Sequence, residues 1–191
     1  WGLRFARVGE TLPGRDGRPT LGPKHEKEIH FMALTPSTML PLGTPAPDFS
    51  LPDLNDQPRS VAEWDGKVLL VNFWATWCPT CVVEMPSMEK LHQQFKNKDF
   101  AMVAVNMQES ETQVRSFFNK LQLSFTALLD SSGEVAAGLA VNALPTTYFL
   151  DKEGRIMGLA LGPRQWDKQA SIELFEFLID RPEPVATSSG S

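Results

Sequence analysis

The chain has 191 residues, of which 42% are hydrophobic and 21% charged, as in an average soluble protein of one domain. This composition supports a hydrophobic core and excludes collagen-like, disordered and disulfide-scaffold proteins, since only two cysteines are present. The net charge is −5 and no basic patch stands out, so nucleic acid is a poor candidate for a partner. No stretch approaches the roughly 18 consecutive apolar residues of a membrane span, and no signal peptide is visible.

The first 45 residues are rich in Gly, Pro and charge, which predicts an extended or poorly ordered segment with one candidate strand at Ile29–Leu34. The chain begins with Trp1, and two interpretations stay open. Processing has removed a signal or anchor, or Met32 is the natural start, which would predict a cytoplasmic protein.

Strands and helices are predicted to alternate through the rest of the chain. A hairpin of Asp48–Leu51 and Arg59–Val61 comes first, and the apolar run Val68–Trp74 is typical of a strand buried on both faces. The further predicted elements are helix Pro79–Phe95, strand Phe100–Met107, helix Glu109–Leu121, strand Thr126–Leu129, helix Gly133–Ala140, strands Thr146–Leu150 and Arg155–Leu161, and helix Trp166–Ile179. This order predicts an α/β fold with a central mixed sheet covered by helices on both faces. We expect one domain that spans residues 46–180, followed by a polar C-terminal tail at residues 181–191.

Both cysteines lie at the junction between a predicted strand and a predicted helix, in the sequence Trp77-Cys78-Pro79-Thr80-Cys81. Unpaired N–H groups at a helix N-terminus stabilise a thiolate, so Cys78 suits an attacking thiol. Cys81 lies one turn further and suits a resolving thiol. Pro79 costs no hydrogen bond at a first-turn position.

Two alternatives to redox chemistry are inert structural cysteines and half of a zinc site. Zinc requires four ligands, and no second CxxC is present. The three histidines, His25, His30 and His92, lie far from the cysteines in sequence. We therefore expect no metal and no cofactor besides the Cys78–Cys81 pair.

Residues 71–81, Val-Asn-Phe-Trp-Ala-Thr-Trp-Cys-Pro-Thr-Cys, resemble the active-site segment of the thioredoxin superfamily, in particular the extracytoplasmic reductases of the ResA and TlpA type. Further resemblances are the opening segment Ala46–Leu54, Pro86 within the active-site helix, and Leu144-Pro145-Thr146 before a strand. The extra helix–strand–helix at residues 108–140 is similar to the insertion of this group. The resemblance implies a thioredoxin fold with an N-terminal hairpin and this central insertion.

The resemblance also implies roles for individual residues. Many thioredoxins carry a buried Asp where this chain has Asn72, which cannot titrate, whereas Glu84 occupies the place of a ResA-type Glu. A carboxyl beside an apolar stripe has a raised pKa and can exchange a proton near neutral pH, although a solvated Glu at the edge of that stripe is the alternative. Pro145 is implied to be cis and to face the cysteines. Substrate contacts are implied for Trp77, Pro79, Thr80, Leu144 and Pro145.

The sequence therefore predicts a monomeric protein-disulfide reductase with a protein substrate and an upstream reductant protein. The resemblance implies an extracytoplasmic location and a reducing role toward apocytochrome c or an oxidase assembly factor. A peroxiredoxin is the first alternative, but Pro and Thr or Ser are missing at the required positions before either cysteine. A copper chaperone of the Sco type is the second, but the chain has CxxC instead of CxxxC and no histidine after His92.

Overall fold

The computed structural model describes residues 40–181, so the candidate strand Ile29–Leu34 lies outside the described residues. A short hairpin, β1 (Ser50–Pro52) and β2 (Pro58–Ser60), leads into a 3₁₀ turn, η1 (Val61–Trp64). The central sheet contains β3 (Val68–Trp74), β4 (Phe100–Met107), β5 (Thr126–Asp130), β6 (Thr146–Leu150) and β7 (Ile156–Leu161). The helices are α2 (Pro79–Phe95), α3 (Glu111–Leu121), α4 (Glu134–Gly138) and α5 (Gln169–Asp180).

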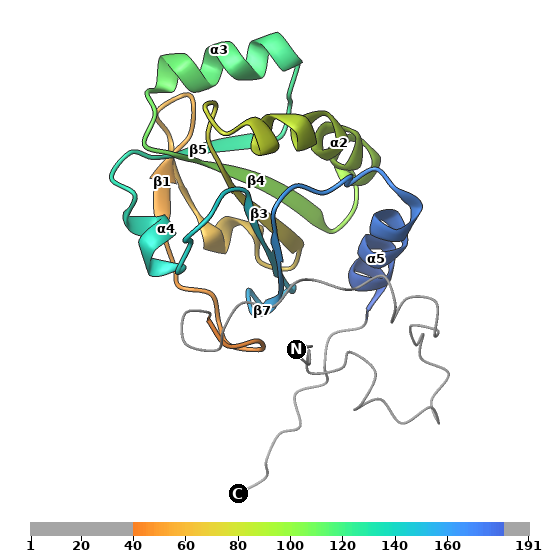
Figure 1. Ribbon diagram of the computed structural model, residues 1–191. Helices are drawn as coiled ribbons and strands as arrows, with labels where there is room; N and C mark the ends of the chain where they lie inside the picture. Colours follow the sequence, from red (N-terminus) through yellow and green to blue (C-terminus); the bar gives the residue numbers. More distant parts are fainter. Residues whose placement is uncertain (1–39, 182–191) are drawn as a thin grey trace, which may run out of the picture.

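The sheet has the strand order β5-β4-β3-β6-β7 and is mixed (Figure 1). Strands β3, β4 and β5 are parallel, whereas β6 runs antiparallel to β3 and β7 antiparallel to β6. The central position of β3 explains its almost uninterrupted apolar sequence, because all seven of its residues are buried. This is the predicted thioredoxin fold, with the hairpin before it and the α3–β5–α4 insertion within it.

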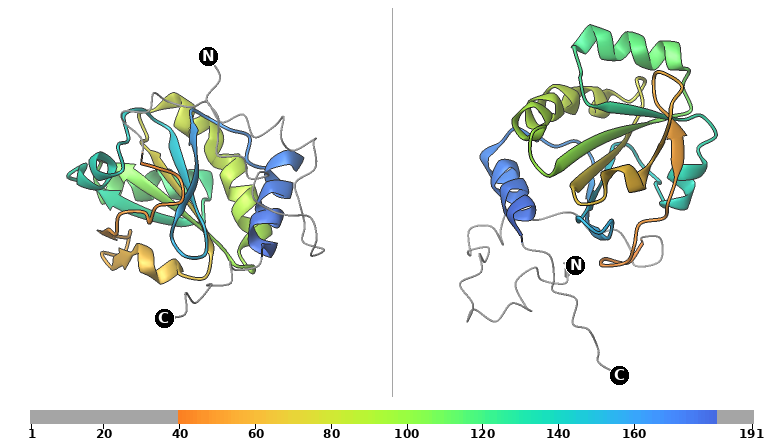
Figure 2. Two further views of the ribbon diagram at one scale, coloured as in Figure 1. Left: turned by 90° about the horizontal axis from the view of Figure 1, so that it is seen from below. Right: turned by 180° about the vertical axis from the view of Figure 1, so that it is seen from behind.

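Helices cover both faces of the sheet (Figure 2). Alternate residues of β3 divide between two cores: Val68, Leu70 and Trp74 pack with residues of α2, α3 and α5, while Leu69, Val71 and Phe73 pack with η1, β1 and α4. The period of two in a strand causes this division. Asn72 therefore belongs by position to the face that α2 covers.

Three predicted helices are shorter in the structure. Helix α3 begins at Glu111 because Ser110 caps it, which leaves Glu109 outside the helix. Helix α4 is confined to Glu134–Gly138, between Gly133 at φ 77° and Ala140 at φ 53°.

The last helix begins at Gln169, not at Trp166. The backbone N–H of Trp166 instead donates to Ser87 Oγ of α2, at 3.1 Å. The segment before α5 is thus held against α2 and not wound into a helix.

Candidate functional site

The cysteines lie where the central strand β3 passes into α2. Cys78 is the N-cap residue of the helix and Pro79 occupies its first turn, where its missing N–H costs nothing. The two cysteines form a disulfide, with Cα atoms 5.3 Å apart. Cys78 is 5% exposed and Cys81 is completely buried, so solvent reaches the first cysteine and not the second. The division into an attacking Cys78 and a resolving Cys81 stays a prediction.

Two polar groups at the helix N-terminus face the sulfur of Cys78. The backbone N–H of Cys81 donates to Cys78 Sγ at 3.2 Å, and Thr80 Oγ1 lies 3.3 Å from the same atom. Both contacts, together with the helix dipole, stabilise negative charge on this sulfur. The chain geometry at Cys78 thus favours a thiolate.

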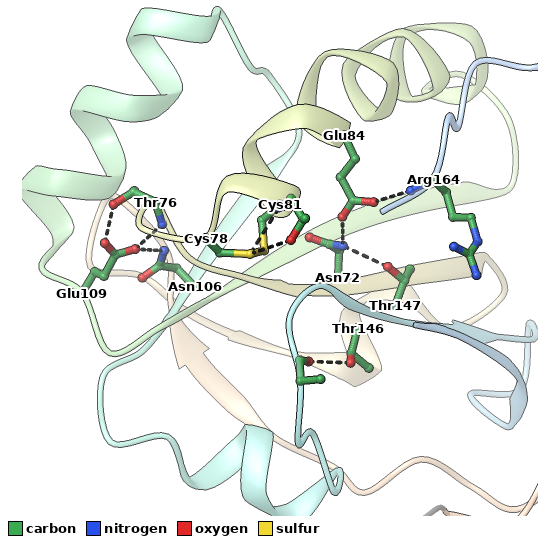
Figure 3. The surroundings of a disulfide bond; sticks show 12 residues. Asn72, Thr76, Cys78, Cys81, Glu84, Asn106, Glu109, Thr146, Thr147 and Arg164 are labelled. Carbon is green, nitrogen blue, oxygen red and sulfur yellow. Dashed lines mark hydrogen bonds between the residues drawn. A yellow bond between two sulfur atoms is a disulfide. The ribbon is translucent and has the colours of Figure 1, made fainter. Parts of the chain in front are cut away.

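Glu84 lies on the buried face of α2, one turn beyond Cys81, and is only 1% exposed. Three N–H groups donate to its carboxylate. Figure 3 shows those of Asn72 Nδ2, at 2.9 Å, and of the Arg164 backbone, at 3.0 Å. The third is Trp166 Nε1, at 3.0 Å. Burial raises the pKa of Glu84 above its ordinary value, and the hydrogen bonds oppose that rise without cancelling it. The alternative of a solvated Glu84 at the edge of the stripe is therefore wrong.

A second buried carboxylate, Glu109, holds the loop that leads into the cysteines. Its oxygens accept hydrogen bonds from the Thr76 backbone at 2.7 Å, from the Thr76 hydroxyl, and from Asn106 Nδ2 at 2.7 Å (Figure 3). Asn106 is paired in register with Trp74 at the end of the neighbouring parallel strand. The position of Trp77 and Cys78 is thus tied to the end of β4.

The Leu144–Pro145 peptide bond is cis, as the resemblance implied. Thr146, the next residue, is paired with Phe73, so the proline lies at the end of the sheet where β3 ends. Its carbonyl accepts from Gly162 N at 2.9 Å. Trp77 is 67% exposed beside Cys78, and Val83 on the outer side of α2 is 76% exposed. Two apolar side chains near the disulfide, those of Trp77 and Val83, are thus exposed to solvent.

Comparison with known proteins agrees with this geometry. Residues 41–173 match the family model described as Redoxin. The chain belongs to the redoxin family. It is 45% identical over 123 residues to the thioredoxin-like protein YneN of Bacillus subtilis, which covers 63% of this chain and 71% of the relative.

Two further comparisons concern named thiol–disulfide proteins. The thiol-disulfide oxidoreductase ResA of Geobacillus thermodenitrificans is 34% identical over 134 residues, or 70% of this chain and 77% of ResA. The crystal structure of a Chlorobium tepidum protein assigned as thiol:disulfide interchange protein DsbE superposes with a TM-score of 0.67 at 29% identity. The superposition covers 73% of this chain and 99% of the Chlorobium tepidum chain. The resemblance to ResA-type proteins is confirmed.

The structure of this redoxin brings Cys78, Cys81 and Glu84 together on the first turns of α2, and the Leu144–Pro145 loop to the same end of the sheet. The sequence did not identify the polar residues around Glu84 and Thr76. Arg164 and Trp166 donate to Glu84, and Thr147 accepts from Asn72. Glu109 accepts from both Thr76 and Asn106. A usable signal existed for Asn106 and Glu109, because polar residues at the end of one parallel strand lie beside those at the end of its neighbour.

Two searches within residues 40–181 concern metals and membranes. No group of three or more His, Cys, Asp or Glu is arranged to hold a metal ion there. No helix in that range has the length and apolar character required to cross a membrane.

Proposed function

We propose that this redoxin is a protein-disulfide reductase in which Cys78 attacks, Cys81 resolves and Glu84 accepts a proton. The observation that carries the proposal is the asymmetry of the pair: Cys78 lies at the helix N-terminus next to solvent, and Cys81 is buried one turn before a carboxyl of raised pKa. The relation to proteins named thiol-disulfide oxidoreductase supports the same chemistry.

The first step forms a mixed disulfide. The Cys78 thiolate attacks one sulfur of the substrate disulfide, the substrate S–S bond breaks, and the released substrate thiolate takes a proton from solvent. The N–H of Cys81 and the hydroxyl of Thr80 hold Cys78 as a thiolate before the attack. Exposed Trp77 and half-buried Leu144, which precedes the buried Pro145, provide the surface on which an extended substrate segment binds.

The second step releases the reduced substrate. Cys81 transfers its proton to the Glu84 carboxylate, and the Cys81 thiolate attacks the sulfur of Cys78. The second substrate sulfur leaves as a thiolate and is protonated, so two electrons pass from the cysteine pair to the substrate. A raised pKa suits Glu84 to this role, because a base works best when its pKa lies near the working pH. An upstream thiol reductant then reduces the Cys78–Cys81 disulfide.

The test is the reduction of insulin disulfides by the whole chain, supplied with a dithiol reductant. We expect wild type and Thr80→Ala to turn over, with Thr80→Ala slower, and Cys78→Ser to be inactive. Equal rates for wild type and Cys78→Ser would overturn the proposal. The direction is tested by equilibration with glutathione, where a reductase stays largely oxidised at ratios that reduce an oxidant such as DsbA.

Cys81→Ser leaves the mixed disulfide unresolved and should trap the substrate, while Cys78→Ser traps nothing.

We also propose that the protein acts outside the cytoplasm, on the strength of its relation to ResA-type reductases. Cell fractionation that finds the mature chain in the cytoplasm would contradict this location.

A further inference from the structure

The side chain of Asn72, at the centre of β3, carries a buried acceptor that the disulfide form does not use. Asn72 is completely buried, and its Nδ2 donates to Glu84 Oε1 and to Thr147 Oγ1, both at 2.9 Å. In the part of the chain that the structure describes, its Oδ1 has no hydrogen-bond partner. Buried carbonyl groups without partners are rare, so this oxygen requires a physical explanation.

The direction of the Asn72 amide is fixed by its neighbours. A carboxylate only accepts hydrogen bonds, so the amide nitrogen must face Glu84 and the oxygen must point away from it. Figure 3 shows the oxygen of Asn72 turned to the side on which the disulfide lies, opposite the side of Thr147 and Arg164. The alternation of β3 places Asn72 on the face covered by α2, on whose buried stripe Cys81 precedes Glu84 by one turn.

The redox state of Cys81 decides whether its sulfur can donate a hydrogen bond. In the disulfide, the sulfur of Cys81 carries no hydrogen and can donate nothing. After reduction the same buried sulfur becomes a thiol with an S–H donor, whereas no other donor among the described residues bonds to Asn72 Oδ1. We propose that Asn72 Oδ1 accepts the S–H of Cys81 in the reduced protein, and so stabilises the dithiol form and orients the resolving thiol.

This inference rests on the resolving role given to Cys81 in the proposed function. When the mixed disulfide is resolved, the S–H bond of Cys81 breaks and its proton passes to the Glu84 carboxylate. The electron pair left on sulfur forms the bond to Cys78 Sγ, and the hydrogen bond to Asn72 is lost. Asn72 cannot take the proton itself, and it therefore acts as a positioning residue that also donates to the base.

The direct test is the infrared S–H stretching band of the Cys78→Ser protein. The chain has only two cysteines, so Cys81 is then the single thiol and its band is unambiguous. We expect the band below the frequency of an alkanethiol in hexane, where no acceptor is present. A band at the hexane frequency in folded Cys78→Ser protein would overturn the proposal without any change at Asn72.

The variants locate the acceptor. Asn72→Leu, or Asn72→Ala if the former does not fold, should move the Cys81 band to the hexane frequency in the Cys78→Ser background. Thr147→Val is the matched control, because it removes a partner of the Asn72 nitrogen and leaves the oxygen in place. A band that stays at its wild-type frequency in both Asn72 variants would assign the acceptor elsewhere and overturn the proposal.

A second readout is the equilibrium between wild-type dithiol and disulfide in glutathione buffers. Asn72→Leu should shift it about fivefold toward the disulfide, the worth of one net hydrogen bond. The hydrogen bond from Asn72 to Glu84 contributes little to this shift if it is present in both the dithiol and the disulfide form. An equilibrium that is unchanged in Asn72→Leu would count against the proposal. Neither measurement depends on turnover, so a failed insulin assay and a failed hydrogen-bond test are distinguishable.

Discussion

Replacing Glu84 by Gln should change how the stability of the oxidised protein depends on pH. Burial raises the pKa of Glu84 above its ordinary value of 4.5, to which it returns on unfolding. Between these two pKa values the folded state binds more protons than the unfolded state, so the free energy of unfolding falls as pH rises. The slope is at most about 1.4 kcal/mol per pH unit. Below the unfolded pKa this loss is absent, and above the folded pKa it is complete and constant.

The size of the effect at acidic pH follows from the contacts of Glu84. For the N–H groups of Asn72, Arg164 and Trp166, a protonated carboxyl offers its carbonyl oxygen and a weaker hydroxyl acceptor, and a Gln amide offers its carbonyl oxygen alone. Near pH 4, wild type and Glu84→Gln should therefore differ by only about the worth of one hydrogen bond, ~1 kcal/mol. As pH rises, the free energy of unfolding of wild type should fall relative to that of the variant, with the slope given above. The change should stop once the pH exceeds the pKa of Glu84 in the folded state.

The assay is urea unfolding of both disulfide-bonded proteins at intervals from pH 4 to about pH 8, compared as the difference between them. Other carboxyls titrate identically in both proteins and cancel. Glu89→Gln is the matched control on the same helix. Burial alone would raise the pKa of Glu89, but hydrogen bonds from Ser124 and Gln93 outweigh it and lower the pKa. The stability that Glu89 contributes is lost as pH falls, so its difference has the opposite sign. A wild-type minus Glu84→Gln difference that is flat or rises with pH would refute the reasoning.

Three further predictions concern stability and substrate binding. Trp77→Ala should leave the free energy of unfolding within about 0.5 kcal/mol of wild type, because the side chain is 67% exposed. It should nevertheless reduce insulin turnover more than turnover of a small aromatic disulfide, and equal losses would argue against substrate contact. Glu109→Ala leaves the donors of Thr76 and Asn106 without their acceptor, so urea unfolding should show a loss of about 2–4 kcal/mol. Met88→Ala opens a cavity in the completely buried stripe of α2 and should cost about 2–5 kcal/mol by the same method, whereas a loss below 1 kcal/mol would mean that the core closes around it.

The parts of the site on β3 and α2 could be predicted from the sequence because their signals are local. The apolar run before Cys78, the proline after it and the helical spacing of Glu84, Met88 and Leu91 each indicate an element or a face. The structure places these three side chains in the core, as the spacing predicted.

Two of the three partners of Glu84 could not be predicted, because they come from the far end of the chain. Arg164 and Trp166 lie 80 and 82 residues beyond it, in a segment without a periodic pattern. An apolar Trp before a helical stretch suggests a helix residue, whereas its indole N–H is needed by the buried carboxylate and its backbone N–H by Ser87. Long-range polar contacts of this kind depend on the path of the whole fold.

The central place of β3 in the sheet has a consequence for amide hydrogen exchange. Its amides lie between β4 and β6 and are completely covered, so they should exchange among the slowest of the molecule. Glu109, the cis-proline and Arg164 lie on turns at one end of this strand or of its neighbours, and the cysteines lie at the same end, at the start of α2. Reduction of the disulfide should then alter exchange in those turns while the protection of β3 persists. The chemistry would thus be performed at the edge of a rigid unit that the redox cycle leaves undisturbed.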